Sequence, residues 1–82
     1  MPRKMKTLNV MLSLSPEACR AYYEGRAEQV HAYSTDGRRV AFPAVALRRV
    51  VTREGVNGIY CLQVSDQGRL LGIRRVADLP AS

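Results

Sequence analysis

Between Thr7 and Leu14, every second residue is a leucine or a valine. One side of this stretch carries Leu8, Val10, Leu12 and Leu14, and the other carries Asn9, Met11 and Ser13. A period of two is typical of a β-strand with one buried face. The stretch therefore predicts a strand whose leucines and valine point into a core.

A short helix is predicted directly after this strand, over residues 16–24. Ser15 can accept a hydrogen bond from a free backbone N–H at the helix start, and Pro16 suits the first helical position because it has no N–H to leave unpaired. Gly25 can adopt the left-handed conformation that ends a helix. The apolar stripe of this helix is expected to comprise Ala18, Cys19, Tyr22 and Tyr23.

The segment AEQVHAYSTDGRRVAF, residues 27–42, predicts a β-hairpin. A two-residue turn at Asp36-Gly37 would pair Tyr33 with Val40. A three-residue loop at 35–37 would instead pair Ala32 with Val40 and Val30 with Phe42. We favour the second register because it keeps the small apolar residues on one face. It sends His31, Tyr33 and Arg39 to the opposite, outer face.

The remaining chain predicts a crossing segment and a second hairpin. Pro43 should end the preceding strand because it cannot donate to a strand ladder. Residues 44–55 are expected to form a helical turn or an irregular crossing, with its inward side chains at Val45, Leu47 and Val50. The second hairpin has its turn at Gln67-Gly68 or more loosely at residues 66–69. Both turns place Leu62 and Val64 against Leu71 and Ile73.

Together these elements predict an α+β, β-rich fold of about five mostly antiparallel strands. Two forms stay open: a strongly twisted sheet and a small barrel. The 82 residues are enough for one domain, 1–82, with an ordered core over residues 7–76. Residues 1–6 are expected to form a basic tail and residues 77–82 a C-terminal tail.

The charge of the chain is positive and uneven. The formal net charge is +6, and residues 38–82 hold eight basic and three acidic residues, a net +5. Such a charge attracts polyanions, although the same arginines could simply form a solvated face. The segment before Leu14 lacks the solid apolar block of a secretion signal, and no apolar run reaches the roughly 18 residues of a membrane span. We expect a cytoplasmic protein that does not contact membranes.

Several chemistries are not supported by the residue inventory. One histidine and two cysteines, without a C-x-x-C motif, cannot fill a tetrahedral metal site within one chain. His31 is the only histidine available as a base for a nucleophile, and a lone histidine on a strand is usually structural or solvent-facing. We therefore expect no metal, no cofactor, no catalytic residue and no enzyme activity. Cys19 and Cys61 suit free thiols in a reducing compartment, with a single bridge between them as the alternative.

Three kinds of binding remain. Nucleic acid is the first, because arginines contact phosphates and aromatic side chains on a sheet can stack bases. The expected site comprises Arg39, Arg48, Arg49 and Arg53, with His31 and Tyr33 beside them. The second is a protein partner or a homodimer, formed through a sheet edge or through Tyr22 and Tyr23 on the helix.

The third is a small nucleotide ligand. Residues 49–53, RVVTR, have the R-x-x-x-R spacing of PilZ domains, and QVSDQG at 63–68 resembles their companion D/N-x-S-x-x-G motif. Gln63 departs from that motif, which has Asp or Asn there. The two motifs also lie closer together in this chain than the resemblance requires.

Three strings carry a broader resemblance: YYEG at 22–25, DGRR at 36–39, and FPA at 42–44 followed by Leu47-Arg48. Over residues 7–76 the chain resembles a family of short, mostly proteobacterial proteins catalogued as domain of unknown function 2835. The resemblance implies a stand-alone cytoplasmic protein with no established activity, and hence no site residue to transfer. Arg49 stands where the family pattern leads us to expect a proline.

Overall fold

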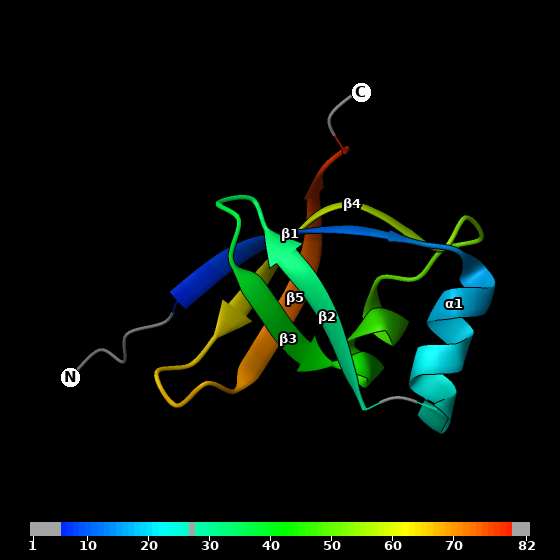
Figure 1. The fold of residues 1–82 in the computed structure, drawn as a ribbon, viewed down its shortest axis with the longest axis horizontal. Helices are drawn as coiled ribbons and strands as arrows, with labels where there is room; N and C mark the ends of the chain where they lie inside the picture. The colour runs from blue at the N-terminus through cyan, green and yellow to red at the C-terminus, as the bar shows by residue number, and fades with distance from the viewer. Residues whose placement is uncertain (1–5, 27, 80–82) are drawn as a thin grey trace.

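A computed structural model describes residues 6–26 and 28–79 of the chain. Five strands form one antiparallel sheet in the order β3-β2-β1-β4-β5 (Figure 1). The sheet is open, with β3 and β5 at its two edges, so the predicted α+β class is confirmed and the twisted sheet is found in place of a closed barrel. The strands are β1 Lys6–Leu14, β2 Gln29–Ser34, β3 Arg39–Pro43, β4 Val56–Val64 and β5 Leu70–Ala77.

The central strand β1 realises the alternation seen in its sequence. It pairs with β4 along its whole length, for example Leu8 with Leu62 and Leu12 with Gly58, and with β2 at Val10 and Met11. Val10 and Leu12 are buried, and Asn9, Met11 and Ser13 on the opposite side of the strand are exposed. β1 begins at Lys6 and β5 ends at Ala77, one residue beyond each predicted limit of the core. Residues 1–5 and 80–82 of the predicted tails lie outside the described residues.

The helix begins as predicted and its regular part is shorter. The Ser15 Oγ accepts a hydrogen bond from the Ala18 N–H at 3.1 Å, and α1 spans Pro16–Ala21. A wider turn, η1, continues over Tyr22–Arg26 and leaves helical geometry at Glu24 and Gly25. Gly25 has φ +96°, the left-handed conformation predicted for the end of the helix.

The first hairpin has the favoured register. Val30 pairs with Phe42 and Ala32 with Val40, and Gly37 takes φ +89° in the three-residue loop. The loop is closed by a 2.8 Å bond from the Ser34 N–H to the Arg38 carbonyl.

The crossing after Pro43 is a 3₁₀ helix, η2, over Ala44–Arg49. Leu47 is buried and Val50 half-buried as predicted, but Val45 is 62% exposed, so its inward placement was wrong. A 3₁₀ helix repeats every three residues, which puts Ala44, Leu47 and Val50 on one face and turns Val45 outward.

Two register shifts interrupt the pairing of β4 with β5, and the one nearer the turn changes the predicted register of the second hairpin. Leu62 faces Ile73 as expected, but Val64 pairs with Leu70 and not with Leu71. A register shift between Gln63 and Val64 inserts one extra residue in β5, and Leu71 is left 49% exposed. Such a bulge leaves one residue unpaired and bends the strand.

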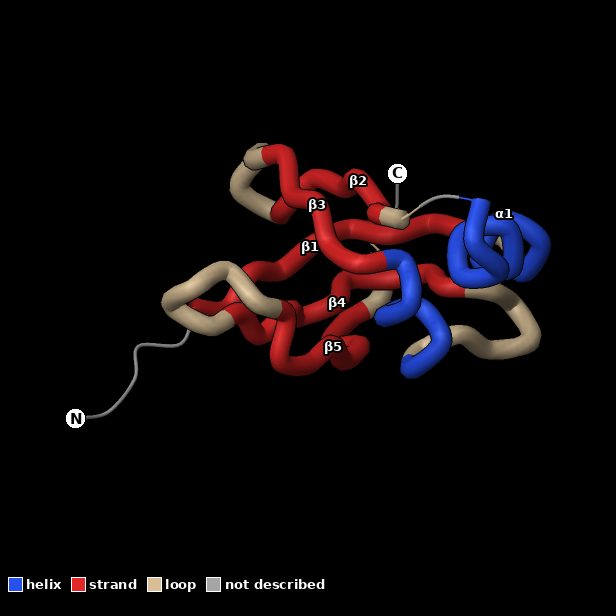
Figure 2. Tube along the Cα trace, turned by 90° about the horizontal axis from the view of Figure 1, so that it is seen from below, coloured by secondary structure: helices blue, strands red, loops and turns tan. Residues whose placement is uncertain are grey.

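The core lies inside a curved sheet. β2 and β3 cross in front of β5 in Figure 1 and lie on the opposite side of β1 from β4 and β5 in Figure 2. The sheet therefore curves so that β3 faces β5 across the core, and Phe42 joins the same buried cluster as Tyr60 and Leu62. α1 contributes Cys19 to this cluster and η2 contributes Leu47. Both cysteines are buried free thiols, so the alternative Cys19–Cys61 bridge is absent.

Candidate nucleic-acid interface

Three of the predicted site residues lie together on the outer face of the first hairpin. Tyr33 on β2 is directly opposite Arg39 on β3, and His31 is opposite Ala41. Alternation along QVHAYS places Val30, Ala32 and Ser34 in the core and leaves His31 and Tyr33 exposed. Tyr33 is 55% exposed, so its ring is accessible to solvent on this face.

This face continues over the neighbouring strands. Met11 on β1 pairs with Tyr33 on one side and with Ile59 on the other, so the three side chains form a row across the sheet. Met11 is 39% exposed. On β5, Arg74 lies opposite Cys61 and is exposed on the same side. We call the group His31, Tyr33, Arg39, Met11, Ile59 and Arg74 the outer face.

The sequence prediction did not include Met11, Ile59 or Arg74 in the site. Met11 was readable as an outward residue from the alternation of its strand. Placing Ile59 and Arg74 on the same face also requires the strand order β1-β4-β5, which no local pattern specifies.

The structure does not bring the other three predicted arginines to this face. Arg48 and Arg49 end η2, whose buried residues pack on the core side of the sheet. Arg53 lies in the turn that joins Thr52 to Gly55. The R-x-x-x-R motif of Arg49 and Arg53 thus spans the end of η2 and this turn.

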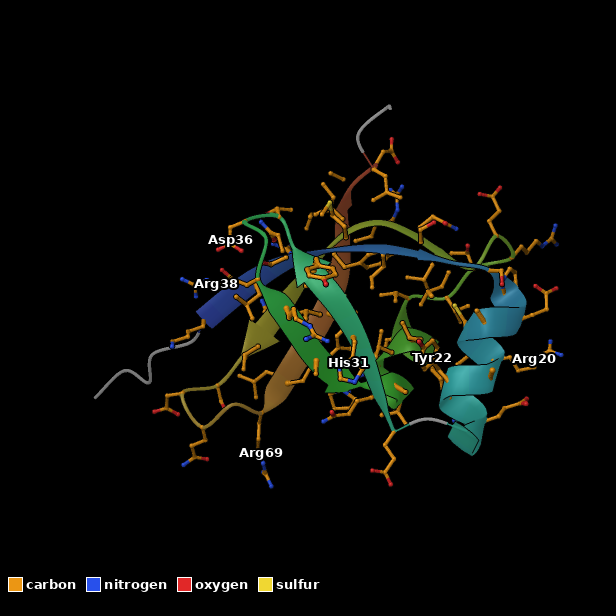
Figure 3. The ribbon with its side chains drawn as sticks, in the orientation of Figure 1. Arg20, Tyr22, His31, Asp36, Arg38 and Arg69 are labelled. Atoms are coloured by element: carbon orange, nitrogen blue, oxygen red, sulfur yellow. The ribbon has the colours of Figure 1, made fainter. Side chains whose placement is uncertain are left out.

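The predicted protein-contact tyrosines are only partly accessible. Tyr22 and Tyr23 are both half-buried and pack against the core cluster. The Arg48 guanidinium carbon lies 5.7 Å from the centre of the Tyr23 ring, a cation–π contact that covers part of that ring. Figure 3 shows Tyr22 beside η2, between the helix and the sheet.

Among the described residues, the arginines of the outer face lack the carboxylate partners that three other arginines have. Within the described residues, carboxylates pair with Arg20 (Glu24, 4.0 Å), Arg38 (Asp36, 3.5 Å) and Arg75 (Asp78). Neither Arg39 nor Arg74 has such a partner there.

The tip of the first hairpin, next to Arg39, is closed by hydrogen bonds of the Ser34 side chain. The buried Ser34 hydroxyl donates to Asp36 Oδ1 and accepts from the Arg38 N–H at 3.0 Å. This hydrogen bond from Ser34, followed by the charge of Arg38, lowers the pKa of the Asp36 carboxyl. Figure 3 shows Asp36 and Arg38 together at this tip.

Residues 6–26 and 28–79 contain no group of three or more histidine, cysteine or acidic side chains placed to hold a metal ion. Over the same ranges, no helix has the length and apolar character needed to cross a bilayer.

The fold and the site define a small α+β protein that buries one face of an open antiparallel sheet and presents aromatic and basic side chains on the other. The chain belongs to the family described as "Protein of unknown function (DUF2835)", whose family model matches residues 6–76. This confirms the resemblance seen in the sequence. No curated protein and no solved structure matches the chain.

Proposed function

We propose that the protein is a non-enzymatic binding module, acting in the cytoplasm, whose outer face binds single-stranded nucleic acid. The observation that supports this most strongly is the pair formed by Tyr33 and Arg39. An exposed aromatic ring lies directly opposite an arginine that has no carboxylate partner among the described residues.

The ring of Tyr33 provides a stacking surface. Bases of single strands stack on aromatic side chains without strong sequence preference, because every base has a π face. Met11 beside Tyr33 extends the apolar surface on which a base would rest, and His31 lies next along β2.

The arginines provide phosphate contacts next to that surface. The bonds from Ser34 N–H to Arg38 and from Ala44 N–H to Glu28 make the even-numbered pairs of this hairpin the hydrogen-bonded ones. Tyr33 and Arg39 therefore form a non-hydrogen-bonded pair, in which the Cα atoms approach to about 4.5 Å. A nucleotide stacked on Tyr33 would have its phosphate within reach of the Arg39 guanidinium. Arg48, Arg49 and Arg53 lie outside this interface and contribute only to the long-range field.

Fluorescence anisotropy with a labelled oligouridine of about 12 nucleotides tests the proposal. We expect saturable binding at about 50 mM salt that weakens at about 200 mM. Two arginine contacts predict a slope of log K against log salt of about −1.4, and Arg39→Ala should reduce it by about 0.7. Tyr33→Ala should weaken binding by about 1–3 kcal/mol, and Tyr33→Phe should retain it because the stacking ring remains.

The double variant Arg48→Ala, Arg49→Ala is the matched control, since it removes two positive charges away from the outer face. This control should lower the affinity for oligouridine less than the double variant Arg39→Ala, Arg74→Ala does. The proposal is wrong if wild-type protein shows no saturable binding at low salt, or if Tyr33→Ala binds like the wild type while circular dichroism shows both folded.

A further inference from the structure

The two edges of the sheet border one groove on the side of the molecule away from the outer face. Its volume is about 570 Å³, within the range of ligand-binding clefts. β3 forms one wall and the β4–β5 hairpin the other, with β1 and the start of β2 completing it. The lining is mainly apolar and comprises Leu8, Gln29, Val40, Ala41, Phe42, Pro43, Leu62, Val64, Gly68, Arg69 and Leu70.

The β3 wall offers unpaired backbone groups. Because the even-numbered residues of β3 bond to β2, the N–H and C=O groups of Arg39 and Ala41 and the C=O of Pro43 point to the free edge. The side chains of Ala41 and Pro43 lie on the opposite face of the sheet, yet both residues line the groove. This is expected because their backbone forms the edge of β3 that borders the groove. The edge can therefore accept a further strand.

The β5 wall is also unpaired where it borders the groove. The Ser65 N–H donates to the Arg69 carbonyl at 2.8 Å, so the next pair, Val64 with Leu70, is a non-hydrogen-bonded one. The backbone of Leu70 then points away from β4, toward the free side of the sheet. β3 and β5 are not neighbours in the hydrogen-bonded strand order of the described residues.

Charge indicates which occupant suits this groove. Arg69 lines the groove, and Arg49 lines an adjoining hollow of about 100 Å³ that shares Pro43 and Leu70 with it. Neither arginine has a carboxylate within salt-bridge distance among the described residues. Figure 3 shows the Arg69 side chain extending outward at the start of β5. A second copy of this chain would bring another +6 of net charge to the same basic rim, which opposes self-association.

We propose that this groove binds an extended acidic peptide segment of a partner protein, added as a strand along the free edge of β3. Alternate side chains of the segment would fill the apolar floor between Val40, Phe42 and Leu70. Its acidic side chains would meet Arg69 and Arg49 at the rim. Main-chain bonds to the edge supply affinity in this mode, and the floor and the charges select the partner.

Anisotropy with a fluorescein-labelled peptide of about eight residues, valine alternating with glutamate, tests this proposal directly. We expect saturable binding, at least about tenfold weaker for the matched peptide with lysine in place of glutamate. N-methylation of the peptide backbone should abolish it. Arg69→Glu should weaken binding about tenfold, whereas Arg20→Glu, the same charge change on α1, should leave it within about twofold.

Ala41→Pro tests the edge itself. It removes an N–H that points away from β2, so the hairpin ladder stays intact and circular dichroism should remain that of the folded protein. Peptide affinity should fall at least about fivefold. Equal affinity for the lysine peptide, or affinity unchanged in both Arg69→Glu and Ala41→Pro, would overturn the proposal. A dimer in sedimentation equilibrium that Ala41→Pro dissociates would assign the groove to a second copy and also overturn it.

The oligouridine assay separates this proposal from the proposed function. Tyr33→Ala should weaken oligouridine binding and leave peptide binding unchanged. Ala41→Pro should weaken peptide binding and leave oligouridine binding unchanged. If Tyr33→Ala abolishes peptide binding and Arg69→Glu does not, the peptide occupies the outer face and the groove proposal fails.

Discussion

Gly55 is the position where one added methyl group should do the greatest damage to this fold. It closes the turn that begins at Thr52, with reciprocal bonds of 3.0 Å between the two backbones, and it has φ +92°. A Cβ at residue 55 would lie 2.1 Å from the Leu14 carbonyl oxygen and 3.0 Å from the Pro16 nitrogen. Both atoms are backbone at the junction of β1 and α1, so no side chain can rotate away.

The cost of Gly55→Ala has two parts. Holding alanine at a left-handed φ costs about 1–2 kcal/mol. Relieving the contact with Leu14 requires a backbone shift of more than an ångström, and overpacking of this kind costs about 1–3 kcal/mol. The free energy of unfolding should therefore fall by about 2–5 kcal/mol, a large share of the stability of so small a domain.

Gly37→Ala and Gly68→Ala are matched controls for the first part alone. Both glycines have positive φ, +89° and +82°, and neither has an atom within 4 Å of the position of an added Cβ. Urea denaturation followed by circular dichroism should show each control losing about 1–2 kcal/mol and Gly55→Ala losing at least about 1 kcal/mol more. Equal losses in the three variants would refute the packing of the turn against the β1–α1 junction.

Three further predictions concern η2, the buried thiol and the hairpin tip. Leu47→Ala should cost about 2–5 kcal/mol in urea denaturation because Leu47 is 0% exposed, whereas Val45→Ala on the outer side of the same 3₁₀ helix should cost less than about 0.5. Burial raises the pKa of the Cys19 thiol above its ordinary 9.0, so stability should be level below that pH and fall as the pH rises above it. Cys19→Ala should remove this fall, and a thiol reagent should reach Cys19 only on unfolding. The lowered pKa of Asp36, caused first by the hydrogen bond from Ser34, contributes stability above pH 3.8 that is lost as the pH falls through the folded-state pKa, and Asp36→Asn should flatten that part of the acid titration.

The sequence predicted those features that depend on neighbours in the chain. Alternation identified the buried side of β1, and the preference for small apolar residues on one face selected the Ala32–Val40 register of the first hairpin. The helix start followed from the side chain of Ser15 and the ring of Pro16. Each of these choices is decided within a few residues, so the sequence alone contained enough information.

The errors arose where distant contacts decide. Periodicity over six residues could not distinguish a 3₁₀ helix from a looser crossing, and Val45 was misplaced for that reason. The bulge that exposes Leu71 lets Ile73 stay opposite Leu62 while Leu70 covers Val64. No residue of the turn indicates this bulge. The bulge is decided by the two packing contacts, which exist only once the sheet has formed.

The split of the predicted arginines has a single physical origin at Phe42-Pro43-Ala44. Pro43 is the last residue of β3, and its nitrogen faces the free edge, where no strand bond is lost. The chain after it leaves the sheet on its core side to bury Ala44 and Leu47. Arg48 and Arg49 follow on that side, away from Arg39. The same departure ends β3 after five residues and places η2 beside the start of β5. One short motif thus separates the two groups of arginines and leaves the edges of β3 and β5 unpaired around the groove.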